Sequence, residues 1–405
     1  MVLVDQAVDP ASDASAMADW AGSGLAYLTG PSVGQPDFSR AAVLAEARRV
    51  TADIAQLLGV EVDAATVLAG RAAILGLTRR GRVSAGGATR LLATADGWCA
   101  IALPRADDVA ALPALLEADA LPDDPWMLLS RWAATCSTEA VVARAQLLDI
   151  VAAGLGEATA EQPSIRPGRR ADGPRRPDGL LVADLSSLWA GPLCAQLLAR
   201  AGAVVVKVES PSRPDGTRGG AAAFFDWMNF GKLSYAVDFD RDRDELYKLL
   251  AAADVVIEGS RPAALQRHQL SIHDVPGYSG RIWLRISGYG GQPDRSAFGD
   301  DAAVAGGLVG ADAQGPVFCG DAIADPLSGL AAARAVGQSL QRGGGEVIDV
   351  SMAQVAAGYA ALLRAPSTST APVVRPQLPP PSPPASPLGA DNPAVRRIVS
   401  ERYCA

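Results

Sequence analysis

The sequence predicts an α/β protein with a mostly parallel sheet and a second, smaller α+β domain. Three observations lead to this prediction. From residue 180 onward, short apolar strand patterns alternate with helical patterns, as in successive βαβ units. A pair of apolar runs flanks an Asp-Gly turn at 91–103, which is typical of a hairpin. The chain has 405 residues, 49% of them hydrophobic, which is enough for two cores.

Composition excludes several classes of function. The net charge of −8 disfavours a general nucleic-acid-binding role. The five cysteines lack CxxC spacing, so we expect neither a disulfide framework nor a metal site. With only two histidines, mechanisms based on imidazole have few candidates. The first residues lack a signal-peptide pattern, and no apolar run reaches the roughly 18 residues of a membrane span, so we expect a cytoplasmic protein.

The N-terminal part divides by pattern into four segments. Residues 1–18 are small and polar and are expected to be flexible. Residues 19–83 carry apolar side chains at helical spacing. Residues 84–160 are expected to form the small domain, with a glycine loop, the hairpin and then helices to about residue 157. Residues 161–178 are rich in Pro, Gly and Arg and are predicted to be a linker.

The large domain is predicted to cover 179–363. Its expected strands are GLLVADL, VVVKVE, LSYAVDF, DVVIEG, RIWLRISGYG and EVIDVS, with helices between them. Residues 364–388 are Pro-rich and are expected to form an extended arm, and 389–405 a C-terminal helix.

A weak internal similarity relates 21–75 to 305–363. Aligning the two segments places Val43 opposite Asp325. One interpretation is a degenerate repeat, and the other is chance similarity between two Ala-rich helical segments.

A series of motifs carries a family resemblance. The run DLSSLWAGPLCAQLLARAGAVVVKVESPSRPDGTR at 184–218 is followed by NFGKLSYAVDF, ISGYG and GDAIADPLSG. In this order the motifs resemble the class III CoA-transferases, the CaiB/BaiF family, over about 180–363. The resemblance implies a Rossmann-like CoA-binding large domain. Because SAGGATRLLATADGWCAIAL at 84–103 resembles the small domain of the family but precedes the large one, the domain order looks rearranged.

The resemblance also implies a set of CoA-binding residues. Leu188, Trp189 and Ala190 would lie beside the pantetheine, Val237 near the adenine, and Arg267 at the phosphates. Further phosphate partners would be Arg213, Lys232 and Arg261, although each could equally be a surface charge. Ser210 and Asp240 stand where some relatives carry cations.

Asp325 aligns with the catalytic carboxylate of the family. It would attack an acyl-CoA to give a mixed anhydride, which requires an ionised carboxylate and exclusion of water. Its place at a helix start is expected to keep it ionised. Gly86 and Gly87 would supply a flexible cover. Asp321, preceded by glycine, is interpreted as a turn-former held by local hydrogen bonds.

Three other interpretations remain. A 2-methylacyl-CoA racemase would share the fold, but its Gly-His-Asp run is Gly299-Asp300-Asp301 here. A catalytically incomplete CoA-binding subunit would fit the rearranged order. Thiol catalysis by Cys319 is a weaker option. As partners, the resemblance implies acyl-CoA and carboxylic acid substrates, with CoA as co-substrate, and a homodimer or a related partner subunit.

Overall fold

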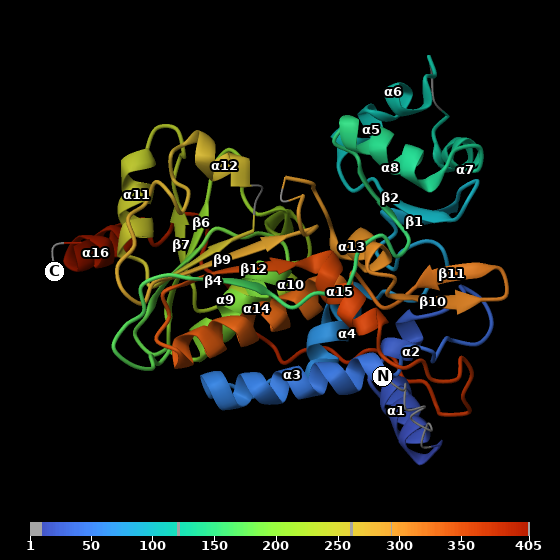
Figure 1. The fold of residues 1–405 in the computed structure, drawn as a ribbon, viewed down its shortest axis with the longest axis horizontal. Coiled ribbons are helices and arrows are strands. Elements are labelled where there is room, and N and C mark those ends of the chain that lie inside the picture. The colour runs from blue at the N-terminus through green and yellow to red at the C-terminus, as the bar shows by residue number, and fades with distance from the viewer. Residues whose placement is uncertain (1–9, 120–121, 260–261, 293, 404–405) are drawn as a thin grey trace, which may run out of the picture.

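A seven-stranded sheet forms the centre of the computed structural model, which describes residues 10–119, 122–259, 262–292 and 294–403 (Figure 1). The strand order is β4-β12-β9-β8-β5-β6-β7, and every neighbouring pair is parallel except β4 with β12. Numbering the six parallel strands along the chain gives the order 3-2-1-4-5-6 of the Rossmann fold. The predicted α/β class is therefore confirmed. The strands are β4 (Ser164–Pro167), β5 (Leu181–Asp184), β6 (Val204–Glu209), β7 (Leu233–Ala236), β8 (Val255–Glu258), β9 (Ile282–Ser287) and β12 (Glu346–Ser351).

Helices cover both faces of this sheet, which is why its central strands read as continuous apolar runs. In Figure 1 the helices of one face lie below the sheet and those of the other above it. The first group comprises α3 (Ala42–Leu58), α4 (Ala64–Leu75), α9 (Ala190–Arg200) and α14 (Ala324–Gln341). The second group comprises α11 (Arg243–Ala252), α12 (Pro262–Arg267) and α16 (Asn392–Tyr403).

The N-terminal helices share the core of the large sheet. Residues of α3 and α4 are buried in the same apolar cluster as α9 and α14. A Cβ atom at Gly337 would lie 2.9 Å from Leu57 Cβ. The backbone of α14 therefore packs directly against the Leu57 side chain of α3. The preceding helices are α1 (Pro10–Gly22) and α2 (Leu25–Leu28). Part of α1 thus falls in the stretch 1–18 that we expected to be flexible, whereas residues 1–9 lie outside the described residues.

A separate antiparallel sheet, β1-β2-β3, forms the core of the small domain. The predicted hairpin corresponds to β1 (Thr89–Ala93) and β2 (Trp98–Ala102). The third strand, β3 (Val151–Gly154), occupies residues that we predicted to be helical. That prediction was wrong because pairing with β2 overrides the helix propensity of an Ala-rich run. Three helices pack against this sheet: α6 (Leu112–Leu116), α7 (Trp126–Ala133) and α8 (Thr138–Leu147). The short helix α5 (Ala106–Ala110) precedes α6.

Several elements were not predicted. Strand β4 lies within the expected linker 161–178 and pairs with β12 at the edge of the large sheet. The others are the 3₁₀ turn η1 (Gly216–Gly219), α10 (Ala222–Asn229), α13 (Gly299–Ala305), β10 (Val309–Asp312) and β11 (Gly315–Phe318). After β12, α15 (Met352–Ala360) leads into the Pro-rich arm. Within the described residues, no helix is both long enough and apolar enough to cross a membrane.

The Pro-rich arm follows the surface back to the opposite sheet edge. Val374 N–H donates to the Ala21 carbonyl at 3.1 Å, and Ala385 N–H donates to the Asp226 carboxylate at 2.8 Å. Beyond the arm, Asn392 exchanges two hydrogen bonds with the backbone of Ala236, in the edge strand β7. The side chain therefore replaces the missing neighbouring strand and protects that edge from pairing with other chains.

Candidate active site

Asp325 lies in the first turn of α14, one residue after the helix begins. Its side chain keeps partial solvent access, and among the described residues no group donates a hydrogen bond to its carboxylate. The start of α13 packs directly against it. A Cβ atom at Gly299 would lie 2.4 Å from Asp325 Oδ2 and 2.3 Å from the Ala322 carbonyl oxygen, so only glycine permits this approach.

Three further aspartates, from α13 and from the loop before α14, surround Asp325. Together the four form what we call the carboxylate cluster, which consists of Asp300, Asp301, Asp321 and Asp325. Burial raises the pKa of Asp325 to about 7, and repulsion from the other three carboxylates adds to this effect. Burial likewise raises the pKa of Asp301 to about 7 and that of Asp321 to about 6. This pKa is higher than expected for a carboxylate that the helix start keeps ionised, because burial and the neighbouring carboxylates outweigh the helix dipole.

One cation, Arg71 of α4, contacts the carboxylate cluster. Its Nη1 donates to Asp321 Oδ1 at 2.7 Å, across 250 positions of sequence. Its guanidinium carbon also lies 5.5 Å from the ring centre of Trp189 and 5.8 Å from that of Phe224, in the range of cation–π contacts. Asp321 is thus not a locally bonded turn-former as predicted. Sequence reasoning missed Arg71, although a single arginine in the apolar helix LAGRAAIL was a usable signal.

The glycine loop of the small domain reaches the carboxylate cluster. The hydroxyls of Ser84 and Thr89 both hydrogen-bond to Asp300, the latter at 3.3 Å. A Cβ atom at Gly86 would lie 3.9 Å from an Nη atom of Arg71, and Gly87 has a φ of 87°. The structure therefore brings the predicted loop to Asp300 and Arg71, beside the carboxylate cluster that contains Asp325, and the role of the loop as a cover stays a prediction.

The predicted pantetheine residues lie where the strand order reverses. In such sheets ligands bind at the carboxyl ends of the strands beside this switch point, here between β5 and β8. Leu188 follows β5 with a φ of 71° and donates its N–H to Asp215 at 3.2 Å. Trp189 is buried, with no partner for Nε1 among the described residues, and Ala190 begins α9. All three belong to one turn, and their contact with CoA stays a prediction.

The remaining predicted CoA residues are dispersed. Val237 is buried in the core above the sheet. Arg213 and Arg267 are exposed, and among the described residues neither guanidinium has a carboxylate partner. Arg261 lies outside the described residues.

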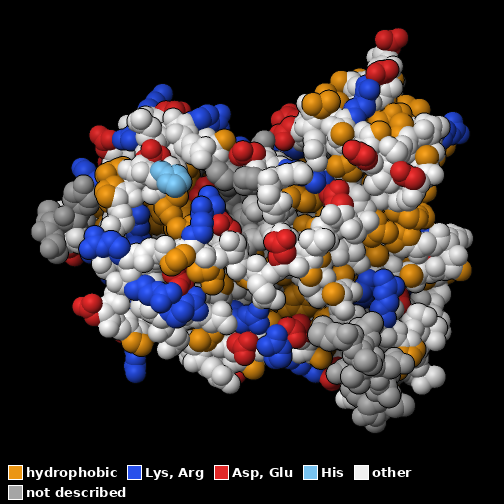
Figure 2. Space-filling model, viewed as in Figure 1, with side chains coloured by type: hydrophobic (Ala, Val, Ile, Leu, Met, Phe, Trp, Pro, Cys, Tyr) orange, Lys and Arg blue, Asp and Glu red, His pale blue; other side chains and the backbone are white. Residues whose placement is uncertain are grey.

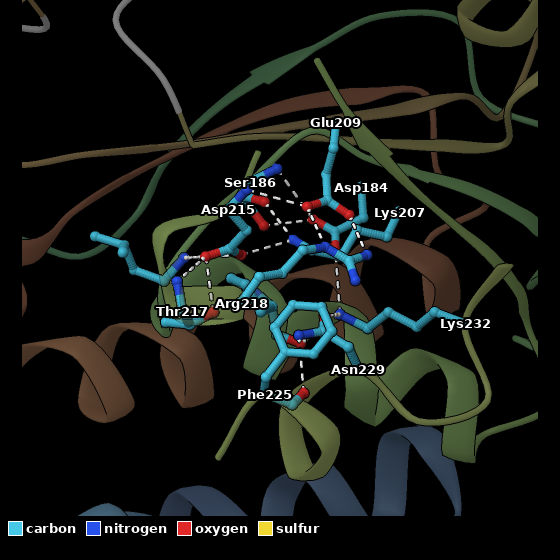
Figure 3. Close-up of polar contacts among 12 residues, drawn as sticks. Asp184, Ser186, Lys207, Glu209, Asp215, Thr217, Arg218, Phe225, Asn229 and Lys232 are labelled. Atoms are coloured by element: carbon cyan, nitrogen blue, oxygen red, sulfur yellow. Dashed lines mark hydrogen bonds and ion pairs between the residues drawn. The ribbon is translucent and has the colours of Figure 1, made fainter. Parts of the chain in front are cut away.

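Lys232 differs from its expected role as a free phosphate partner. Its ammonium group is buried and donates to Asp184 at 2.9 Å, to the Pro192 carbonyl at 3.0 Å and to Asn229 at 3.1 Å (Figure 3). Burial lowers its pKa to about 8 despite the attraction of Asp184. Lys232 therefore offers no exposed ammonium group to a phosphate.

Lys232 belongs to a network of six charges, the paired-charge network, of which five are buried and Arg218 is partly exposed (Figure 3). Its ion pairs are Lys232–Asp184, Lys207–Asp215 at 2.9 Å and Arg218–Glu209 at 2.6 Å. Each carboxylate therefore has its own cation. Sequence reasoning did not find this network because Lys207 and Glu209 lie inside the apolar strand VVVKVE.

Cys319 and the two histidines offer no competing catalytic group. Burial raises the pKa of the Cys319 thiol to about 12, so the reactive thiolate is suppressed. His268 lies beside the exposed Asp240, with 3.4 Å between Nδ1 and Oδ1, and His273 follows in the same loop region. Neither histidine belongs to the carboxylate cluster.

A cleft of about 530 Å³ lies between the small domain and the loop at 294–296. It is lined on one side by 146–150 and Ala152, and Figure 2 shows the hollow between the upper right lobe and the rest of the molecule. None of its lining residues belongs to the carboxylate cluster.

Comparison with known proteins identifies the large domain. Residues 178–379 match the profile of CoA-transferase family III. A succinyl-CoA–D-citramalate CoA-transferase of Chloroflexus aurantiacus is 29% identical over 199 residues, 44% of this chain and 50% of the relative. A probable fatty acyl-CoA transferase of Mycobacterium tuberculosis is 33% identical over 210 residues, 46% of this chain and 53% of the relative.

Similar solved structures also exist. A CAIB/BAIF family protein from Brucella suis aligns with 30% identity and a TM-score of 0.42, covering 46% of this chain and 56% of that chain. The chain spans about half the length of the curated relatives it matches. On the profile match and these identities, residues 178–379 of this chain belong to CoA-transferase family III.

Proposed function

We propose that this protein transfers CoA from an acyl-CoA thioester to a carboxylic acid through covalent intermediates on Asp325. The observation that carries the proposal is the partial exposure of the Asp325 side chain together with its lack of hydrogen-bond donors among the described residues. Asp325 and Asp300 are the two partly exposed members of the carboxylate cluster, and of these two only Asp325 has, among the described residues, no hydrogen bond donated to its oxygens. A carboxylate free of hydrogen bonds is a better nucleophile than one that donors already stabilise.

The chemistry needs no external energy source. An oxygen of Asp325 attacks the acyl-CoA carbonyl, the C–S bond breaks, and CoA leaves as a thiolate, giving a mixed anhydride. The thiolate then attacks the aspartyl carbonyl, and the donor acid leaves with the electron pair of the broken C–O bond. The acceptor carboxylate attacks the resulting aspartyl thioester, which forms a second anhydride and releases the thiolate. Attack of the thiolate on the acceptor carbonyl gives the product thioester and regenerates Asp325.

The environment of Asp325 supports this cycle in two ways. Its pKa of about 7 leaves a substantial ionised fraction at neutral pH and gives the carboxylate a higher basicity than a solvent-exposed aspartate has. The surrounding buried residues and the glycine loop limit the access of water, which would hydrolyse an anhydride. Gly86 and Gly87 are the residues proposed to move when substrate enters.

CoA is proposed to lie across the switch point, with the pantetheine beside Leu188, Trp189 and Ala190. Arg213 and Arg267 are the exposed cations available to its phosphates. Relatives are named for succinyl-CoA, mesaconate and formyl-CoA with oxalate, so a small organic acid is the proposed class of acceptor.

Trapping the intermediate tests this proposal. The full chain is incubated with a panel of acyl-CoAs that includes succinyl-CoA, hydroxylamine is added, and the modified residue is located by mass spectrometry. We expect a hydroxamate at Asp325 that is absent in Asp325→Asn and still present in Asp321→Asn. CoA binding without any adduct would instead favour a CoA-binding subunit. Exchange of the α-proton for deuterium without an adduct would favour the racemase, with Asp300 in place of its histidine.

The assembly is a separate prediction. A homodimer or a complex with a related subunit is expected from the family resemblance. Light scattering of the purified chain measures this, and a monomer that turns over substrate would contradict it.

A further inference from the structure

The guanidinium of Arg71 has hydrogen-bonding capacity that the protein does not use. An arginine carries five N–H donors, and among the described residues only one contact is made, from Nη1 to Asp321. The side chain is 25% exposed, so the remaining donors are neither fully hydrated nor fully paired. The ring faces of Trp189 and Phe224 border the guanidinium and withhold water from it.

Two buried polar atoms beside Arg71 also lack partners among the described residues. One is Oδ2 of Asp321, whose side chain is 1% exposed, and the other is Nε1 of Trp189, whose residue is 2% exposed. Buried polar groups in proteins are nearly always hydrogen-bonded, so such atoms indicate that a ligand or water belongs there. The Nε1–H of Trp189 is a donor that fits a carboxylate oxygen, whereas Asp321 Oδ2 is an acceptor that needs a proton donor such as water. Both atoms belong to residues that contact Arg71.

The charge around Arg71 points to the kind of ligand. Among the described residues, Arg71 is the only cation that forms an ion pair with the carboxylate cluster, and Arg295 lowers only the pKa of Asp301. A carboxylic acid substrate would add a further negative charge. Such a ligand needs a cationic partner, and a planar guanidinium matches a carboxylate through two parallel N–H···O bonds.

We infer that Arg71 binds the carboxylate of the acid substrate, so that the N-terminal helices complete a site built mainly by the CoA-transferase domain. This inference rests on the proposed function for the identity of the ligand. Arg71 would hold the donor acid when the aspartyl C–O bond breaks and would hold the acceptor acid before it attacks the aspartyl thioester. Asp321 competes for the same guanidinium and limits how tightly the acid is held.

Direct titration of an acid tests the inference without turnover. Succinate is titrated calorimetrically into the full chain saturated with CoA, for the wild type, Arg71→Gln, Arg71→Lys and Asp321→Asn. Arg49→Gln is the matched control, because Arg49 is a 58% exposed arginine on the neighbouring helix α3. Affinity for CoA and the thermal unfolding midpoint are measured for every variant.

We expect Arg71→Gln to weaken succinate binding on the order of 30-fold, as for loss of a charge-assisted contact. Arg71→Lys should retain part of the affinity, since it keeps the charge but loses the planar fork. Asp321→Asn should tighten binding several-fold, which a merely structural arginine would not produce. Arg49→Gln should change nothing, and CoA affinity should stay within about threefold throughout.

The inference is overturned if the wild type does not bind succinate, or if Arg71→Gln binds it equally well. It is also overturned if Arg71→Gln loses CoA and succinate affinity together with a lower unfolding midpoint. Arg71-dependent succinate binding without an adduct at Asp325 would keep the arginine assignment and remove the transferase mechanism, so the two failures are distinguishable.

Discussion

Two groups of buried charges lie in this molecule, and they are balanced differently. In the paired-charge network, three carboxylates each face a cation at 2.6–2.9 Å (Figure 3). In the carboxylate cluster, Arg71 lowers the pKa of Asp300, Asp321 and Asp325 but forms an ion pair with only Asp321, and Asp301 is influenced instead by Arg295. The three carboxylates of the network are buried, whereas Asp300 and Asp325 of the cluster are partly exposed.

This difference in charge balance shifts the pKa values of the aspartates in opposite directions in the two groups. In the network, burial alone would raise the pKa of Asp184 and Asp215, but the nearby lysines reverse the sign and both pKa values are lowered. In the cluster, burial and mutual repulsion prevail, and the pKa of Asp325 rises to about 7. Paired charges keep the carboxylates ionised, whereas a buried carboxylate without its own cation titrates near neutral pH.

The largest expected effect is on catalysis in the cluster. Asp325→Asn should lower the rate of CoA transfer on the order of 10⁴-fold, because an amide cannot form the anhydride. The rate is measured as acyl exchange between acyl-CoA and a labelled acid. Asp53→Asn, a partly exposed aspartate of α3, is the control. Transfer at the wild-type rate in Asp325→Asn would remove the nucleophile assignment and with it the contrast between the two groups.

The next largest effect is on stability in the network. Lys232→Met leaves Asp184 buried without its main cation and should lower the free energy of unfolding by about 3–5 kcal/mol. Denaturant unfolding measures this. Replacing both partners, with Lys232→Met and Asp184→Leu, should recover part of the loss, since no unpaired charge remains. Arg213→Met, at an exposed site, should change stability by less than about 0.5 kcal/mol.

The pH dependence of adduct formation tests the raised pKa of Asp325 that distinguishes the cluster from the network. Because the nucleophile must be ionised, adduct formation at Asp325 should rise about tenfold per pH unit below its pKa of about 7 and then level off. Arg71 lowers this pKa, so Arg71→Gln should move the inflection to higher pH. A wild-type profile that is flat from pH 5 to pH 8 would show that Asp325 is fully ionised throughout.

The free energy of unfolding should respond to rising pH in the opposite direction from adduct formation. The folded chain retains the Asp325 proton between its unfolded pKa near 4 and its folded pKa near 7, so this residue makes the free energy of unfolding fall as pH rises through that interval. Asp325→Asn should remove that part of the slope.

The smallest expected effect concerns the exposed cations. Arg213→Ala and Arg267→Ala should each weaken CoA binding by about three- to tenfold, and more at low salt, because exposed charge pairs are screened. Binding is measured by calorimetry at two salt concentrations, with Arg49→Ala as control. Unchanged affinity in both variants would place the CoA phosphates elsewhere.

The sequence by itself determined the α/β class and the motifs of the family, whereas the order of the strands came from the structure. Strand and helix patterns from residue 180 onward depend on local periodicity, which survives without knowledge of partners. Asp325 and the glycine loop were found in the same way, from motifs with fixed local spacing.

The tertiary structure decided which charged side chains form ion pairs and which of them have shifted pKa values. Lys232 looked like a free cation and is paired inside the protein, whereas Asp321 looked like a local turn residue and contacts Arg71 from the N-terminal helices. The strand β3 and the ionisation of Asp325 were also decided by distant neighbours. The physical reason is common to all of them: a pKa or an ion pair depends on distances and burial in space, and sequence periodicity encodes neither.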